Sequence, residues 1–66
     1  MRAIQMMRKD GVPVLIFTHS IVTIWNDEGD WVIETTDDAN RRFPGTDHND
    51  ETIQRLLMEV LCHLSE

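Results

Sequence analysis

Three histidines and one cysteine are the side chains of this chain best suited to bind a transition metal. They are His19, His48, Cys62 and His63. Zinc sites in proteins use closely spaced ligand pairs, such as Cys-x-x-Cys or two histidines about one helical turn apart. Cys62 and His63 are adjacent, so their side chains would diverge by about 100° on a helix. The spacing does not indicate a metal site, and we expect no cofactor.

Catalysis needs a nucleophile, or a pair of carboxylates inside a cleft. Cys62 falls near the end of an expected helix, where the helix dipole opposes a thiolate. Two acid pairs, Asp37 with Asp38 and Asp47 with Asp50, have the right groups for acid–base chemistry. A chain of 66 residues has little room for the cleft they would need. We therefore expect a protein that is not an enzyme.

The clearest local pattern is a β-hairpin over residues 21–36. Its centre, the run from Asn26 to Asp30, predicts a type I turn with a glycine in the left-handed conformation. In that register Trp25 lies directly opposite Trp31. Both faces of the hairpin are then apolar.

An antiparallel sheet with one solvated face normally alternates apolar and polar residues. A single helix can cover only one face of this hairpin, so the other face must meet another part of the chain, a second copy or a partner protein. A nearby arginine pair beside a phenylalanine has the composition of an interface hot spot; alternatively, the phenylalanine packs at the start of the helix. The candidate interface comprises Val22, Ile24, Trp25, Trp31, Val32, Arg41, Arg42 and Phe43.

Residues 3–9 are compatible with a strand or a short helix, and their alternating apolar side chains favour a strand. An Asp-Gly pair follows at residues 10–11 and predicts a two-residue turn, which would place Met7 opposite Val14. Pro13 has no amide hydrogen, so it should lie at a sheet edge or face away from its partner strand.

The apolar segment from Val14 to Trp25 is interrupted by the polar residues 18–20. Either His19 and Ser20 form a tight turn between two strands, or the segment is one long strand with a bend. We favour the long strand, because neither residue readily adopts the positive φ of a tight turn.

Residues 36–49 are polar and rich in turn-forming residues, and we expect a long loop there. A helix should follow from about Asp50 to Leu64, capped by Asp47 or Asn49. Its apolar residues recur at spacings of three and four, which places them on one stripe. We expect this stripe to form the core with residues of the sheet: Phe17, Ile21 or Ile24, Ile33, Ile53, Leu56, Leu57, Val60, Leu61 and Trp25.

The expected fold class is therefore α+β, with residues 1–66 in a single small domain. It would consist of a small antiparallel sheet of three or four strands, built from β-hairpins, and one C-terminal amphipathic helix packed on one face. A single cysteine allows no intrachain disulfide. A chain this short is only marginally stable, so it would gain from oligomerisation.

The charges are unevenly placed along the chain. The formal net charge is −6, with +2 over residues 1–25 and −8 over residues 26–66. Such a surface repels polyanions, which disfavours nucleic-acid binding. The sequence has neither a signal-peptide pattern nor a membrane-length apolar run, and its one cysteine is typical of a reducing compartment. We expect a cytoplasmic protein that does not contact membranes.

Three hypotheses for function follow. The leading one is a small acidic, non-enzymatic protein–protein interaction module that forms a homodimer and binds another protein. The alternative is an acidic inhibitor, a nucleic-acid mimic that occupies a basic groove of a nucleic-acid-binding protein. The third is a weak nucleic-acid binder that uses the basic side chains Arg2, Arg8, Lys9, Arg41 and Arg42.

Overall fold

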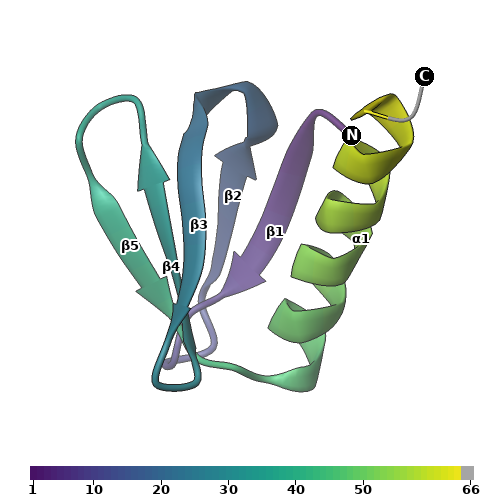
Figure 1. Cartoon of the computed structure of the whole chain (residues 1–66). Helices are drawn as coiled ribbons and strands as arrows, with labels where there is room; N and C mark the ends of the chain where they lie inside the picture. The colour runs from purple at the N-terminus through teal and green to yellow at the C-terminus, as the bar shows by residue number, and fades with distance from the viewer. Residues whose placement is uncertain (65–66) are drawn as a thin grey trace.

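The computed structural model describes residues 1–64 and confirms the α+β fold class. Its elements are β1 (Ala3–Met7), β2 (Pro13–Phe17), the 3-10 turn η1 (Thr18–Ser20), β3 (Ile21–Asp27), β4 (Asp30–Thr35), β5 (Asn40–Phe43) and α1 (Asp47–Leu64). The strands form two antiparallel sheets, β1-β2 and β3-β4-β5. The helix follows all the strands and packs along β1 (Figure 1).

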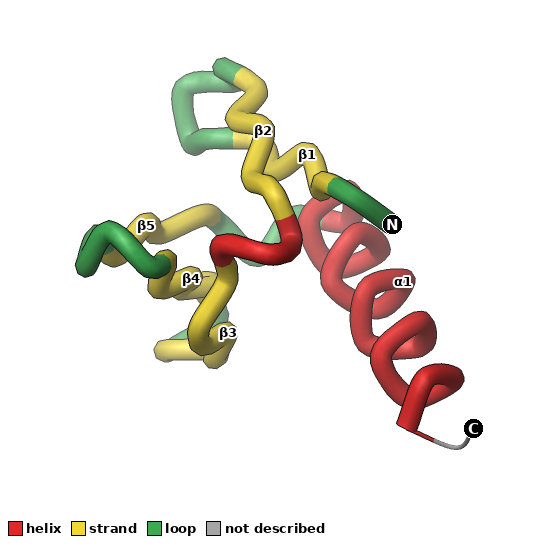
Figure 2. Tube along the Cα trace, turned by 90° about the horizontal axis from the view of Figure 1, so that it is seen from above, coloured by secondary structure: helices red, strands yellow, loops and turns green. Residues whose placement is uncertain are grey.

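The chain changes sheet at η1, so the prediction of one long strand through residues 14–25 is wrong. The Thr18 amide still donates to the Arg2 carbonyl of the first sheet at 2.9 Å. The Ser20 carbonyl already accepts the Thr36 amide, beside the second sheet, at 2.8 Å. Only a sharp turn can cross from one sheet to the other within two residues. Figure 2 shows η1 as the link between the two layers.

The first hairpin has a three-residue turn rather than the predicted two-residue one. The Arg8 amide donates to the Val12 carbonyl, and the Gly11 amide donates to the Arg8 carbonyl, both at 2.9 Å. Gly11 has a φ of +85°, which a glycine adopts without strain. Met7 therefore lies opposite Pro13, one residue away from the expected register.

This shift decides which side chains of β1 and β2 face the core, because a one-residue slip turns every side chain to the other face. The inward face of the hairpin carries Ile4, Met6, Val14 and Ile16. The expected core residue Phe17 instead points outward and is 53% exposed.

The second hairpin has a two-residue turn, where three residues were predicted. Glu28 and Gly29 both have positive φ, at +52° and +91°, which is the conformation of a type I′ turn. Trp25 therefore lies opposite Val32, and Trp31 lies opposite Asn26. The expected pairing of the two tryptophans is wrong, because they lie on opposite faces of the sheet.

The expected loop over residues 36–49 contains β5, which pairs with β4 along its whole length. A short turn allows this pairing. The Asp38 amide donates to the Thr35 carbonyl at 3.0 Å, and the Thr35 amide donates to the Ala39 carbonyl at 3.1 Å. Asp38 takes a left-handed conformation, with a φ of +64°, that acidic and amide residues tolerate better than most.

The helix begins three residues earlier than predicted, and its cap is Thr46 rather than Asp47 or Asn49. The Thr46 hydroxyl accepts the Asn49 amide at 3.3 Å, and the Thr46 carbonyl accepts the Asp50 amide at 2.8 Å. This is the bonding pattern of an N-cap threonine. Asn49 is then free for a different role inside the fold.

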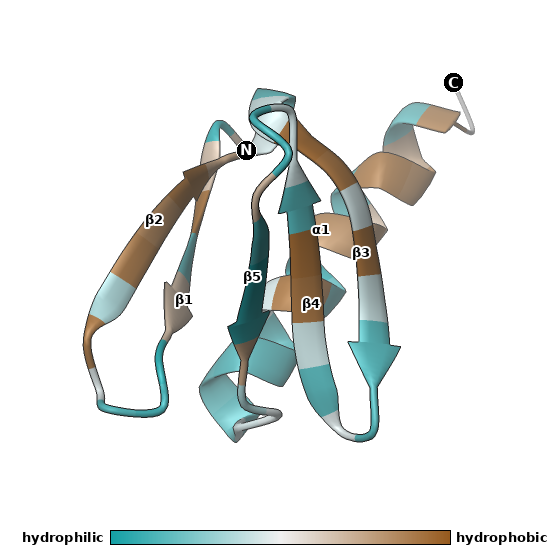
Figure 3. Cartoon of the chain, turned by 90° about the vertical axis from the view of Figure 1, so that its left-hand side faces the viewer, coloured by the Kyte–Doolittle hydropathy of each residue, from teal (hydrophilic) through white to brown (hydrophobic). Residues whose placement is uncertain are grey.

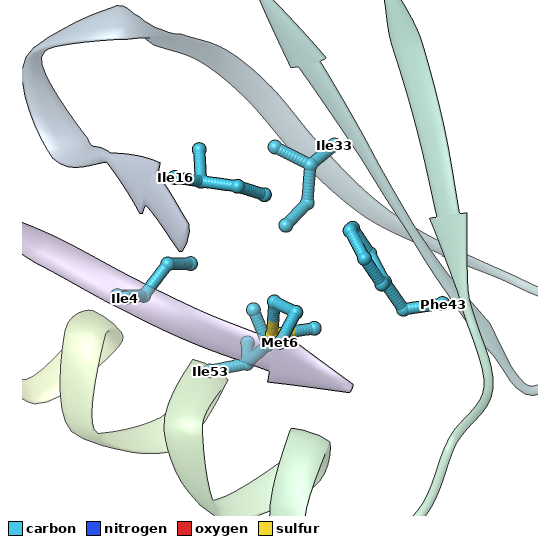
Figure 4. Packing of buried hydrophobic residues seen from close by; sticks show 6 residues of the cluster. All are labelled: Ile4, Met6, Ile16, Ile33, Phe43 and Ile53. Carbon is cyan, nitrogen blue, oxygen red and sulfur yellow. The ribbon is translucent and has the colours of Figure 1, made fainter. Parts of the chain in front are cut away.

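The core lies between the two sheets and takes one buried apolar side chain from the helix. It comprises Ile4, Met6, Ile16, Ile33, Phe43 and Ile53 (Figure 4). Leu56 packs partly against this cluster. Leu57, Val60 and Leu61, which were expected in the core, are exposed.

Candidate functional site

The eight predicted interface residues do not form one surface, because some of them lie in the core and others face solvent. Val22 and Trp25 are exposed, and Ile24 and Trp31 are half-buried against the core. Val32 and Phe43 are buried, at 4% and 2% exposure. The remaining two, Arg41 and Arg42, lie on opposite faces of β5.

Arg42 closes the outer face of the second sheet. Its guanidinium donates to Asp27 Oδ2 at 2.6 Å and to Asp30 Oδ2 at 3.2 Å. The hydrogen bonds that the guanidinium donates raise the pKa of Arg42 above its usual value, and the bond to Asp27 contributes more than the bond to Asp30. The register sets Arg42 and Trp25 on either side of Val32. Val32 on the outer face is therefore covered by side chains of the same chain.

Arg41, on the inner face, joins a small polar cluster at the end of β4. Its guanidinium donates to Thr35 Oγ1 at 2.6 Å and to Asp37 Oδ2 at 3.5 Å. The Thr35 hydroxyl also donates to Asp37. This hydrogen bond, followed by one from the Ala39 amide, lowers the pKa of the Asp37 carboxyl. The cluster anchors the β4–β5 turn rather than offering a free cation.

Asn49 is a buried polar residue that the sequence reasoning treated only as a possible cap. Its side-chain oxygen accepts the Met7 amide at 2.8 Å, and its side-chain nitrogen donates to the Met7 and Pro44 carbonyls at 2.9 and 2.8 Å. The side chain thus pairs with the open edge of β1 as a neighbouring strand would. It fixes the start of α1 to the first sheet.

The far half of α1 carries an unpartnered apolar surface, which we call the α1 stripe: Leu57, Val60, Leu61 and Leu64. These side chains are 56%, 45%, 54% and 78% exposed. Figures 2 and 3 show why, since this half of the helix diverges sideways from the strands.

The lengths of the elements contribute to this exposure. A helix of 18 residues is about 27 Å long, whereas a strand of five residues spans about 17 Å. The neighbouring strand β1 can therefore cover only the first half of α1.

A second exposed apolar surface lies on β2, where Leu15 and Phe17 are 62% and 53% exposed. A groove of about 340 Å³ runs beside this strand, bounded on its other side by Thr36, Asp37 and Arg41. The β2 surface and the α1 stripe are separate, because β1 lies between β2 and the helix (Figure 1).

The acidic side chains are spread over several local pairs. Besides the pairs with Arg41 and Arg42, Trp31 Nε1 donates to Asp50 Oδ1 at 2.8 Å, and Arg55 forms an ion pair with Glu51. Within residues 1–64, no group of three or more histidine, cysteine or acidic side chains is placed to hold a metal ion. The one helix in this part of the chain is not apolar enough to cross a membrane.

Comparison of the chain with protein families, with curated proteins and with solved structures finds no match.

Proposed function

We propose that this protein is a small non-enzymatic interaction module that binds another protein through the α1 stripe. The observation that carries the proposal is the exposure of Leu57, Leu61 and Leu64 on a helix whose other end is fixed firmly to the fold. The exposed parts of the stripe and the neighbouring Met58 amount to about three whole side chains. Their burial against a partner would contribute about 5–9 kcal/mol before the costs of association.

The charge of the helix indicates the chemistry of this partner. Residues 47–64 carry four acids, Asp47, Asp50, Glu51 and Glu59, against the single cation Arg55. Three of these acids lie in the first two turns, away from the stripe, and Glu59 pairs with the amino group of Met1. The net charge of −6 on the whole chain nevertheless repels a second copy and attracts a partner whose apolar side chains are flanked by lysine or arginine, and those charges would speed the encounter. We therefore assign the stripe to a different protein.

The test compares two exposed apolar positions that receive the same charge. Leu61→Asp places a carboxylate in the stripe, and Val22→Asp places one on β3, where Val22 is 58% exposed. Each tagged variant and the wild type is used to capture proteins from lysate of the source cell, and the affinity for each captured protein is then measured. We expect Leu61→Asp to weaken binding of the specific partner at least tenfold and Val22→Asp to leave it unchanged.

Two outcomes would contradict the proposal. Equal binding by both variants would mean that the stripe is not the binding surface. A partner that is released completely at high salt, and that binds Leu61→Asp normally, would instead support the acidic-inhibitor hypothesis, since salt screens exposed charge pairs.

A further inference from the structure

β2 has a free edge on which some backbone groups have no partner. In an antiparallel pair, hydrogen-bonded residue pairs alternate with pairs whose backbone groups point away from each other. The bonds at Arg8–Val12 and at Thr18–Arg2 fix this alternation in the first hairpin, so the amide and carbonyl of Leu15 point away from β1. In the described part of the chain, no hydrogen bond reaches these two groups.

β5 has a free edge of the same kind. The bond from the Thr35 amide to the Ala39 carbonyl starts the alternation between β4 and β5, so the backbone groups of Asn40 and Arg42 point away from β4. Among residues 1–64, these groups have no hydrogen-bond partner either. Figure 2 shows β2 and β5 on either side of the opening between the two sheets, away from α1.

A groove lies between these two strands. Its first part, of about 340 Å³, is lined by residues 14–17 of β2 and, on the other side, by residues 35–37 and Arg41. Its second part, of about 300 Å³, is lined by Arg8, Val14, Arg41, Arg42 and Phe43. Because the two parts share Val14 and Arg41, they form one groove that follows both strands.

The backbone of an extended peptide is the ligand that suits two facing strand edges. Its amide and carbonyl groups point alternately to either side, so one residue bonds β2 and the next bonds β5. Its side chains point alternately into the groove and out to solvent. The floor of the groove is apolar, since Ile16 and Phe43 are 5% and 2% exposed. Neither a nucleic acid nor a small anion offers alternating donors and acceptors of this kind.

The charges of the groove indicate one side chain that the peptide should carry. The second part of the groove is lined by three arginines, Arg8, Arg41 and Arg42, and by none of the described acids. Each guanidinium has five N–H donors. Arg41 and Arg42 use two donors each on neighbouring side chains, and Arg8 pairs with the exposed Asp10. A carboxylate in this part of the groove would accept donors that are still unused.

The rest of the chain favours a single acid in the peptide over a run of acids. The net charge of −6 repels a polyanion, and Asp37 lines the first part of the groove. Beside that part, Leu15 and Phe17 expose apolar side chains. The matching peptide therefore carries one aspartate or glutamate next to the arginines and apolar residues along β2.

We propose that the groove between β2 and β5 binds an extended segment of another protein, with one acidic residue flanked by apolar residues. The segment would add a strand and close the open side between the two sheets. This inference goes beyond the proposed function, because the groove and the helix lie on opposite sides of the molecule (Figure 2). A single strand covers less than the roughly 800 Å² per partner of a standard interface, so we expect a dissociation constant on the order of micromolar.

The test selects ligands without assuming their sequence. A random library of peptides of about nine residues, the length of a long strand, is displayed on phage and selected on the full chain. Synthetic copies of the enriched peptides are then titrated against two charge reversals, Arg8→Glu in the groove and Arg2→Glu outside it. Both change the net charge equally. We expect Arg8→Glu to weaken binding about tenfold or more and Arg2→Glu to change it less than about twofold.

Amide hydrogen exchange of the wild-type protein tests the backbone pairing without any variant. The amides of Ile16 and Arg41 are bonded within the two sheets, whereas those of Leu15 and Arg42 point to the free edges. A bound peptide should slow the exchange of Leu15 and Arg42 by about tenfold or more, because it supplies the missing acceptors.

Three results would overturn the inference. They are a selection that enriches no peptide, binding that survives Arg8→Glu, and binding that leaves the exchange of Leu15 and Arg42 unchanged. Leu61→Asp should leave the peptide bound. Peptides that Leu61→Asp releases, and that Arg8→Glu does not, would occupy the α1 stripe; this result would overturn the inference and support the proposed function.

Discussion

Asn49 shows how one polar side chain can hold three segments of a small protein together. It lies fully buried and bonds backbone groups of β1 and of the segment before α1. Buried amides of this kind are costly to remove, because their partners lose hydrogen bonds that water cannot replace. The helix has few apolar anchors in the core, so this polar contact takes a large share in positioning it.

We predict that Asn49→Ala lowers the free energy of unfolding by about 1–3 kcal/mol for each backbone group that it leaves buried and unpaired. Thr52→Ala is the control, because Thr52 lies on the same helix and its hydroxyl bonds only the exposed His48 carbonyl. That variant should change stability by less than about 0.5 kcal/mol. Urea unfolding measures both; equal effects of the two substitutions would show that Asn49 does not fix the helix.

At the scale of the elements, the sequence predicted type and order well but predicted register poorly. Both hairpins and the helix are where the apolar periodicity placed them. Each turn differs from its predicted length by one residue. The first turn, residues 9–11, is one residue longer than predicted, and the second, residues 28–29, is one residue shorter. Turn length depends on which residues take positive φ, and the sequence offered a suitable glycine for either choice in each hairpin.

The one-residue errors had large consequences for the candidate site. They placed Phe17 on the outward face and the two tryptophans on opposite faces, so an expected core residue became exposed and an expected cross-strand pair was separated. β5 was missed because its polar sequence resembles a loop, and its only buried side chain is Phe43. Pairing with β4, rather than local propensity, makes this segment a strand.

The turn at Glu28 offers a test of the register. A glutamate at a φ of +52° is strained, whereas asparagine tolerates this conformation. We predict that Glu28→Asn raises the free energy of unfolding by about 0.5–1 kcal/mol.

The control for that substitution is Lys9→Asn in the first hairpin, where only Gly11 has a positive φ, so no gain is expected there. The midpoint of urea unfolding, at an unchanged slope, measures both effects. A three-residue turn between β3 and β4 would give Glu28 a right-handed conformation. The substitution would then bring no gain, which would contradict the observed register.

At the scale of the whole molecule, the proposed function rests on the divergence of the far half of α1 from the strands. The sequence correctly placed the apolar stripe on α1 but assigned it to the core, because periodicity shows which face is apolar and not what covers it. Only the three-dimensional arrangement shows that the far half of the helix diverges from the sheets. The α1 stripe is therefore left exposed.

The most direct test of this account is the cost of truncating one residue of the α1 stripe in the purified protein. Leu61→Ala keeps helix propensity and should change the free energy of unfolding by less than about 0.5 kcal/mol. Ile53→Ala, on the same helix but within the core, should cost about 2–5 kcal/mol. If Leu61→Ala also cost about 2–5 kcal/mol, the stripe would be part of the core in solution, and its assignment as a binding surface would be wrong.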